Sequence, residues 1–267
     1  MKNILYKAAL ILALSLSITA CSSDDEKESA DTTGKIGLEF DNAFGDNDLI
    51  LETQNNTTSS NEALKIKLVR YIVSNIVLTK ADGTTFTYPK SKSYFIADEN
   101  APAGHTFELT DVPTGDYVKV KFGIGVDKEQ WLLGASGQGD FLAQAQAADM
   151  LWNWTAGYKF FALEGTFTSA TVTSASTFMI HTGQTGTDYN YTEVTLDLPT
   201  KALVRTNISP DVHIITDLSK VFNGPNKLKL TDYNEGGMGA MIMGGAALPL
   251  VTTNIATMFK VDHVHND

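Results

Sequence analysis

Cysteine is almost absent from this chain. The 267 residues include a single one, Cys21. One cysteine cannot form an intramolecular disulfide, so stability must come from a hydrophobic core or from a bound metal ion. Positive charge is also scarce: 20 Lys and Arg stand against 31 Asp and Glu, for a net charge of −11. A chain this acidic is not suited to binding nucleic acid through its phosphates.

The common catalytic motifs are missing as well. The sequence holds no P-loop, no H-E-x-x-H and no EF-hand loop. Residues 134–138 (GASGQ) fail the G-x-S-x-G pattern because the last position is Gln. We therefore expect a protein that is not an enzyme. Hydrophobic residues make up 43% of the chain, which is enough for a sizeable core.

The N-terminus has the pattern of a bacterial lipoprotein signal. Lys2 and Lys7 precede an apolar run at residues 8–18, which is too short to span a membrane. The sequence I-T-A-C then places Cys21 where a lipobox requires it. We expect a signal peptide at residues 1–20, a diacylated Cys21 and a flexible acidic tether at residues 21–34. Ser22 and the acidic S-D-D-E that follows favour the outer membrane, facing the periplasm or the outside.

Short alternating segments separated by turn residues fill residues 35–267 and predict one domain. They are typical of a mostly β fold, a single β-sandwich of jelly-roll or Ig-like type with one or two short helices. Strands are expected at residues 36–40, 64–78, 85–88, 94–97, 106–109, 117–124, 158–167, 171–181, 191–198, 202–208 and 213–215. Helices are expected at residues 138–149 and 248–258, one helical turn at 217–222, and a Gly/Met-rich loop at 236–245.

Residues 150–165 (MLWNWTAGYKFFALEG) hold two of the three tryptophans, two positions apart. On a strand, Trp152 and Trp154 would share one face, and aromatic side chains commonly anchor a core. We expect at least one of them to be buried.

This stretch and several others resemble a known family. The order F-G-I-G-V-D at residues 122–127, a loop, and M-x-W-x-W-x-x-G-Y-K-F-x-x-L-E-G resembles the MbnP-like copper-binding proteins of the bacterial envelope. The likeness extends to R-Y-I-V-S-N-I at residues 70–76, to H-T-G at 181–183 and to N…M-F between residues 254 and 259. It covers roughly residues 35–265.

The resemblance implies a copper site made of histidines and a tryptophan oxidised to kynurenine. It also implies a partner that performs the oxidation, a di-haem enzyme of the cytochrome c peroxidase type. Trp152 and Trp154 are both candidates for the modified residue. The W-N-W pattern departs from the W-x-H of the related MopE proteins.

Imidazole is the commonest metal ligand in proteins, and the chain has five histidines. His181 ends a predicted strand at a glycine turn. His263 and His265 form an H-x-H pair after the last predicted helix, whose apolar residues should dock the tail on the sandwich. We expect His181 and at least one of His263 or His265 to share a copper ion, with His213 as the reserve candidate and His105 as the weakest of the five.

The sequence thus predicts an exported lipoprotein that binds copper for acquisition or storage. The sequence leaves two alternatives open. One is a surface β-sandwich that binds glycan or protein without a metal, using the tryptophans as a stacking platform. The other is an enzyme that uses copper redox chemistry.

Overall fold

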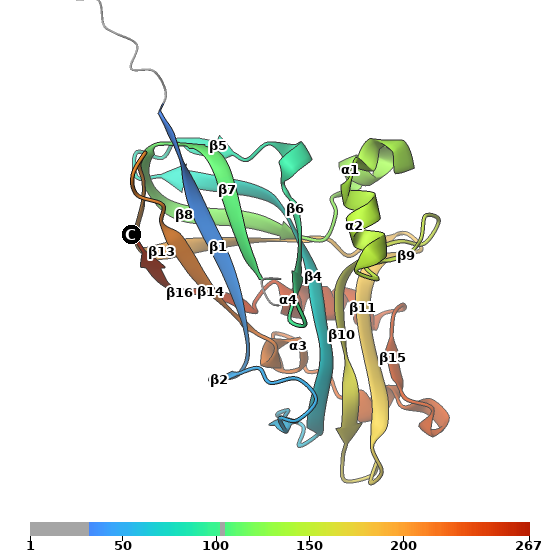
Figure 1. Cartoon of the computed structure of the whole chain (residues 1–267). Coiled ribbons are helices and arrows are strands. Elements are labelled where there is room, and N and C mark those ends of the chain that lie inside the picture. The colour runs from blue at the N-terminus through green and yellow to red at the C-terminus, as the bar shows by residue number, and fades with distance from the viewer. Residues whose placement is uncertain (1–31, 102–104) are drawn as a thin grey trace, which may run out of the picture. The chain divides into compact units, whose positions relative to one another are not determined.

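The computed structural model describes residues 32–101 and 105–267 (Figure 1). The predicted signal peptide, the lipidation site at Cys21 and most of the predicted tether lie outside the described residues. The first strand begins at Thr33, inside the range predicted as tether. No helix in the described part of the chain is long and apolar enough to cross a membrane.

The described residues are mostly β, as predicted, and form two sheets. The smaller sheet has five strands in the order β16-β14-β1-β2, with β7 also paired to β1. β1 and β14 are parallel, and the other pairs in this sheet are antiparallel. Its strands are β1 (Thr33–Phe44), β2 (Asn47–Asp48), β7 (Thr106–Pro113), β14 (Asp211–Asp217) and β16 (Phe259–His265).

The larger sheet has eleven strands, six of which follow the order β12-β11-β10-β4-β8-β13. The other five each pair with one strand of this series: β15 with β11, β9 with β10, and β3, β5 and β6 with β4. β4 is central: its first half pairs with β10 and its second half with β8. The strands are β3 (Asn56–Thr57), β4 (Ala63–Lys80), β5 (Thr85–Thr87), β6 (Tyr94–Asp98), β8 (Gly115–Ile124), β9 (Leu151–Asn153), β10 (Gly157–Thr168), β11 (Ser176–Thr185), β12 (Asp188–Tyr189), β13 (Thr192–Val204) and β15 (Ala240–Ile242).

Helices are short and lie in the connections. The α-helices are α1 (Lys128–Leu132), α2 (Phe141–Ala147), α3 (Ser219–Asn223) and α4 (Ala247–Ile255). The 3₁₀ helices are η1 (Lys90–Lys92), η2 (Ala135–Gln138), η3 (Leu230–Tyr233) and η4 (Glu235–Gly237).

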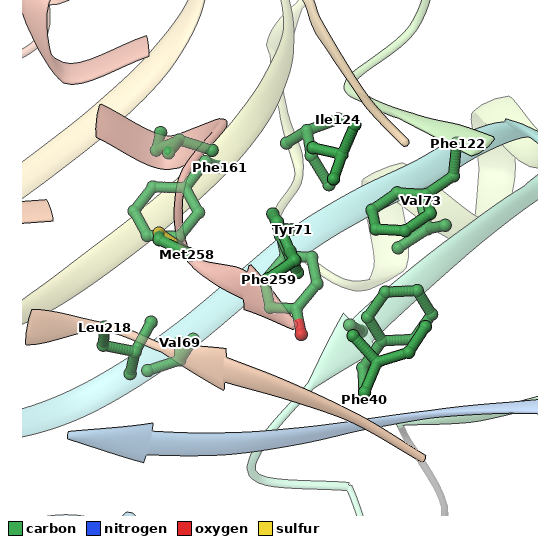
Figure 2. Packing of buried hydrophobic residues seen from close by; sticks show 14 of the residues in the cluster. Phe40, Val69, Tyr71, Val73, Phe122, Ile124, Phe161, Leu218, Met258 and Phe259 are labelled. Atoms are coloured by element: carbon green, nitrogen blue, oxygen red, sulfur yellow. The ribbon is translucent and has the colours of Figure 1, made fainter. Parts of the chain in front are cut away.

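The two sheets pack through one aromatic core, which Figure 2 shows. Phe40 of β1 meets Phe122 of β8 edge to face at a centroid distance of 5.2 Å. Phe259, the first residue of β16, contacts Phe122 in the same way, also at 5.2 Å. Edge-to-face contacts add to the free energy gained by burying these rings. The tail after α4 is therefore docked on the sandwich by Met258 and Phe259, as the sequence predicts.

A second, smaller cluster covers the outer face of the larger sheet. Tyr158, Phe160 and Ala162 of β10 point away from the main core and pack against Phe141 of α2 and Met150. Residues between β8 and β10 thus form a cap on that face, and α1, α2 and β9 all belong to it (Figure 1).

Several predicted elements differ from the structure, and the strand expected at residues 171–181 begins only at Ser176, as β11. The helix expected at residues 138–149 spans only Phe141–Ala147, because Gly139 and Asp149 at its two ends have positive φ angles. The strands expected at residues 191–198 and 202–208 are one strand, β13, with an irregularity in its pairing. The Gly/Met-rich stretch is not all loop: Ala240 and Ile242 are buried, and β15 adds in parallel to the edge of β11.

Candidate functional site

Neither tryptophan of the W-N-W motif is buried, so the expectation of a buried core tryptophan is wrong. Trp152 and Trp154 are both half-buried. β9 pairs with β10 at only two positions, on the outer side of the larger sheet. The chain turns directly after Asn153, whose side-chain oxygen accepts a hydrogen bond from the Ala156 amide at 2.8 Å. This turn sends the two indoles to different neighbours.

Trp154 packs on the third tryptophan. Its ring lies 4.1 Å from that of Trp131 on α1, tilted by 30°, and both rings meet the edge of Tyr158. The pair is part of the cap over the outer face. In the described part of the chain, neither Trp131 nor Trp154 has a histidine ring as a neighbour.

Trp152 instead lies beside His181, with a ring-centroid distance of 6.2 Å. The glycine of the H-T-G motif makes room for it. A Cβ on Gly183 would lie 2.8 Å from Cζ3 of Trp152 and 2.5 Å from the carbonyl oxygen of Tyr158. Both contacts are too close for a real side chain, so only glycine at position 183 allows the indole to lie next to the histidine. We call Trp152, His181 and Gly183 the Trp–His site.

His181 is held on the outer face of β11, because Phe178 and Ile180 point into the main core. The residue is 3% exposed. Nε2 lies 2.7 Å from Oε1 of Glu164 on β10, whereas Nδ1 is buried without a hydrogen-bond partner. Burial lowers the pKa of His181, and the Glu164 carboxylate acts in the opposite direction. Burial is the larger effect, so the lowered pKa favours a neutral imidazole with one nitrogen free to bind a metal ion.

An open hollow of about 460 Å³ borders this site. Trp152 forms part of its wall and Met243, which follows β15, forms another part. The remaining lining comes from Thr155, Ala156, Gln184, Thr185 and Gly186. Met243 therefore borders the same hollow as Trp152, whereas His181 is not among the residues that line it.

The other predicted ligands gather elsewhere. His213 of β14 stands directly opposite His263 of β16, and His265 follows two residues later. The ring centroids of His213 and His263 are 4.7 Å apart, and those of His263 and His265 are 4.5 Å apart. Asp41 of β1 and Asp262 of β16 lie beside them. We call these five residues the histidine cluster.

Electrostatic effects within the histidine cluster differ between its two acids. The hydrogen bond from His263 lowers the pKa of Asp262. Burial raises the pKa of Asp41, although the nearby His213 acts in the opposite direction.

The prediction that His181 shares an ion with His263 or His265 does not fit this geometry. Val212 and Ile214 of β14 point into the core, so His213 between them faces outward from the smaller sheet. His181 faces outward from the larger sheet, on the opposite side of the core. The structure therefore contains two separate groups of candidate ligands. Sequence reasoning did not select Glu164 or Asp41, whose contacts with histidines are made across strands. It also did not select Asp262, which is next to His263 in the sequence.

The family comparison agrees with the motifs. The family model described as MbnP matches residues 33–242, so this chain belongs to the MbnP family. Among solved structures, the chain is similar to MbnP from Methylosinus trichosporium, with 17% identity, a TM-score of 0.50, and coverage of 80% of this chain and 82% of that one. That likeness supports the fold. The sequence matches no curated protein.

Proposed function

We propose that this protein is an exported, lipid-anchored member of the MbnP family that binds copper at the Trp–His site, for acquisition or storage, without catalytic turnover. The observation that carries the proposal is the buried, unpartnered Nδ1 of His181 beside Trp152. A buried polar atom without a partner is costly, and a bound ion would satisfy it.

The residues present fit copper, provided that the tryptophan is modified. His181 offers one imidazole nitrogen, and Met243 offers a soft thioether of the kind that suits Cu(I). An unmodified indole N–H is only a hydrogen-bond donor, so Trp152 itself cannot act as a nitrogen ligand. Kynurenine has an aromatic amine and a ketone oxygen, and both are possible ligands.

Trp152 is the better candidate for this oxidation. It adjoins His181, whereas Trp154 is packed against Trp131 and Tyr158. The reaction adds two oxygen atoms, from O₂ or from two molecules of peroxide, across the pyrrole C2–C3 bond, which breaks. Water then releases the formyl carbon as formate. We propose a di-haem enzyme of the cytochrome c peroxidase type as the partner that supplies the oxidising equivalents.

Copper titration of variants tests the site. The experiment uses protein produced in its native host, where the oxidising partner is present, in a background in which His213 and His263 are both alanine, so that the histidine cluster does not contribute. In this background, His181→Ala should lose copper binding and Trp154→Phe should keep it. Protein purified from its native host should contain copper, and a peptide mass should identify kynurenine at Trp152. Unchanged copper binding by His181→Ala would refute this assignment.

The lipid anchor has its own test. Cys21 is the only cysteine and stands at the lipobox position. Cys21→Ser should abolish acylation and processing at that position, and the variant should no longer partition with membranes or detergent. Normal processing of this variant would show that the anchor was assigned wrongly.

The alternative of a glycan-binding or protein-binding surface has weaker support. Such a platform needs exposed aromatic faces side by side, but Trp131 and Trp154 stack on each other and Trp152 lies beside His181. Binding of glycans to the metal-free protein, lost in Trp154→Ala, would favour this alternative.

A further inference from the structure

The histidine cluster has the construction of a second metal site, independent of the Trp–His site. It lies on the outer face of the smaller sheet, and most of its residues are on β14 and β16. β16 lies wholly outside residues 33–242, the part of the chain that matches the family model. Three of the five residues of the cluster, Asp262, His263 and His265, thus lie beyond the matched range, whereas Asp41 and His213 lie inside it.

A bulge in β16 brings the ligands to one face. Ile214 pairs with Val261, but His213 pairs with His263, so Asp262 is an extra residue opposite His213. Val261 and Val264 both pack against the core although they are three residues apart. In a regular strand, neighbouring side chains point to opposite faces, and a bulge redirects one of them. Here the bulge turns the side chains of both Asp262 and His263 outward, next to His213.

Three donor atoms then converge. One ligand atom from each of His213, Asp262 and His263 lies within 4.8 Å of the other two. Oδ2 of Asp262 is 2.7 Å from Nδ1 of His263 and 3.9 Å from Nδ1 of His213. Two donors on one tetrahedral ion, each bonded at about 2.0 Å, are about 3.3 Å apart. Relative to that spacing of about 3.3 Å, the 3.9 Å contact must close by about 0.6 Å and the 2.7 Å contact must open by about 0.6 Å.

The second nitrogen of each imidazole also faces a partner. Nε2 of His263 is 2.8 Å from Nε2 of His265, and Nε2 of His213 is 3.4 Å from Oδ2 of Asp41. A histidine that binds a metal through one nitrogen commonly donates the N–H of the other to such a partner, which fixes the ring orientation. Nδ1 of His213 is buried and has no hydrogen-bond partner at present.

We propose that His213 Nδ1, Asp262 Oδ2 and His263 Nδ1 bind one divalent first-row transition ion, with His265 and Asp41 as positioning residues. Two imidazoles and one carboxylate suit Zn²⁺ and Cu²⁺, whereas Ca²⁺ and Mg²⁺ prefer oxygen ligands alone. The side chains of His263 and Asp262 are 42% and 52% exposed, so the ion has access from solvent and water can take the fourth position. The site needs no modified residue.

Zn²⁺ titration of the full-length protein in detergent tests this site, because Zn²⁺ is redox-inert and does not require kynurenine. Wild type and His181→Ala should bind one Zn²⁺ with the same affinity. The double variant His213→Ala/His263→Ala should lose this binding. His265→Ala and Asp41→Asn should weaken it by about 10–100-fold, as expected for residues that orient ligands.

Two controls keep the result interpretable. Thermal melting of the metal-free variants reports whether each one folds. If the double alanine variant unfolds, His263→Gln, a change at a half-exposed surface position, replaces it in the titration. Zn²⁺ should also shift the imidazole NMR signals of His213 and His263 and leave those of His181 unchanged.

Zn²⁺ binding by a folded His263→Gln or double variant with wild-type affinity would overturn the proposal, and so would a wild type that binds no Zn²⁺. Loss of Zn²⁺ binding in His181→Ala would equally overturn it, because it would place the ion at the Trp–His site. Failure of the copper assignment at His181 leaves all of these outcomes unaffected, so the two proposals can fail separately.

Discussion

Asp127, the last residue of the F-G-I-G-V-D motif, connects the cap to β4, η1 and β6. One carboxylate oxygen accepts hydrogen bonds from Lys90 Nζ at 2.8 Å and from the Gln130 amide at 3.0 Å, where Asp127 caps α1. The other accepts from Tyr94 Oη at 2.7 Å and from Asn75 Nδ2 at 2.9 Å. Burial by itself would raise the pKa of Asp127, but these hydrogen bonds outweigh it and lower the pKa to about 2.

The perturbation is Asp127→Asn. Asparagine caps helices as well as aspartate does, so this change removes mainly the charge. A pKa lowered from 3.8 to about 2 corresponds to about 2 kcal/mol of folding free energy at neutral pH. Because the folded-state pKa is the lower one, this stability is present above pH 4 and is lost as the pH falls from about 4 to about 2. About 1 kcal/mol should remain at pH 3.

Urea denaturation at pH 7 and at pH 3 measures both values. Glu129→Gln is the matched control: it removes a charge 4.0 Å from the same Lys90, but that side chain is 93% exposed. The control should change stability by less than about 0.5 kcal/mol. An Asp127→Asn variant as stable as wild type at pH 7, or a deficit of the same size at both pH values, would refute the reasoning.

Two further predictions concern close packing and buried hydrogen bonds. Gly183→Ala should lower the free energy of unfolding by about 1–3 kcal/mol and alter tryptophan fluorescence, because the new Cβ would displace Trp152. Gly244→Ala is the control and should do neither, because its Cβ would meet nothing closer than 3.4 Å. Glu62 is fully buried and accepts hydrogen bonds from the amide and hydroxyl of Thr231 at 2.8 and 2.6 Å. Glu62→Gln should lower the free energy of unfolding, measured by chemical denaturation, by about 1–3 kcal/mol. An unchanged free energy of unfolding would mean that water replaces the hydrogen bonds to Thr231.

Alternation of apolar residues predicted much of the sandwich correctly. Ile36, Leu38 and Phe40 point into the core as expected, and the long strand at residues 64–78 is β4. The last strand was missed because the bulge at Asp262 interrupts its alternation, which leaves Val261 and Val264 three residues apart. A period of two is the main local signal of a strand, and a bulge removes it.

The candidate site was only partly predictable for a related reason. The sequence identified His213, His263 and His265 as candidate ligands, but it could not show which other histidine they approach. That depends on which sheet each strand joins and which face each side chain takes. Asp41 carried a weak signal, because it lies on the polar side of a strand whose alternate residues are apolar. Glu164 belongs to the L-E-G motif, but its partner His181 is on the next strand.

The parallel pairing of β1 with β14 has a consequence for folding kinetics. Gly37 is aligned with Asp211, and its amide donates a hydrogen bond to the carbonyl oxygen of Pro210 at 2.8 Å. Asp211 is aligned in turn with His265. Such contacts join residues far apart in the chain, and a high contact order slows folding because a large loop must close before the contact is gained. Among the described strands, β1 has only β2 and β7 as partners until β14 has been synthesised. The smaller sheet therefore completes late, and until then the chain exposes unpaired strand edges that can aggregate.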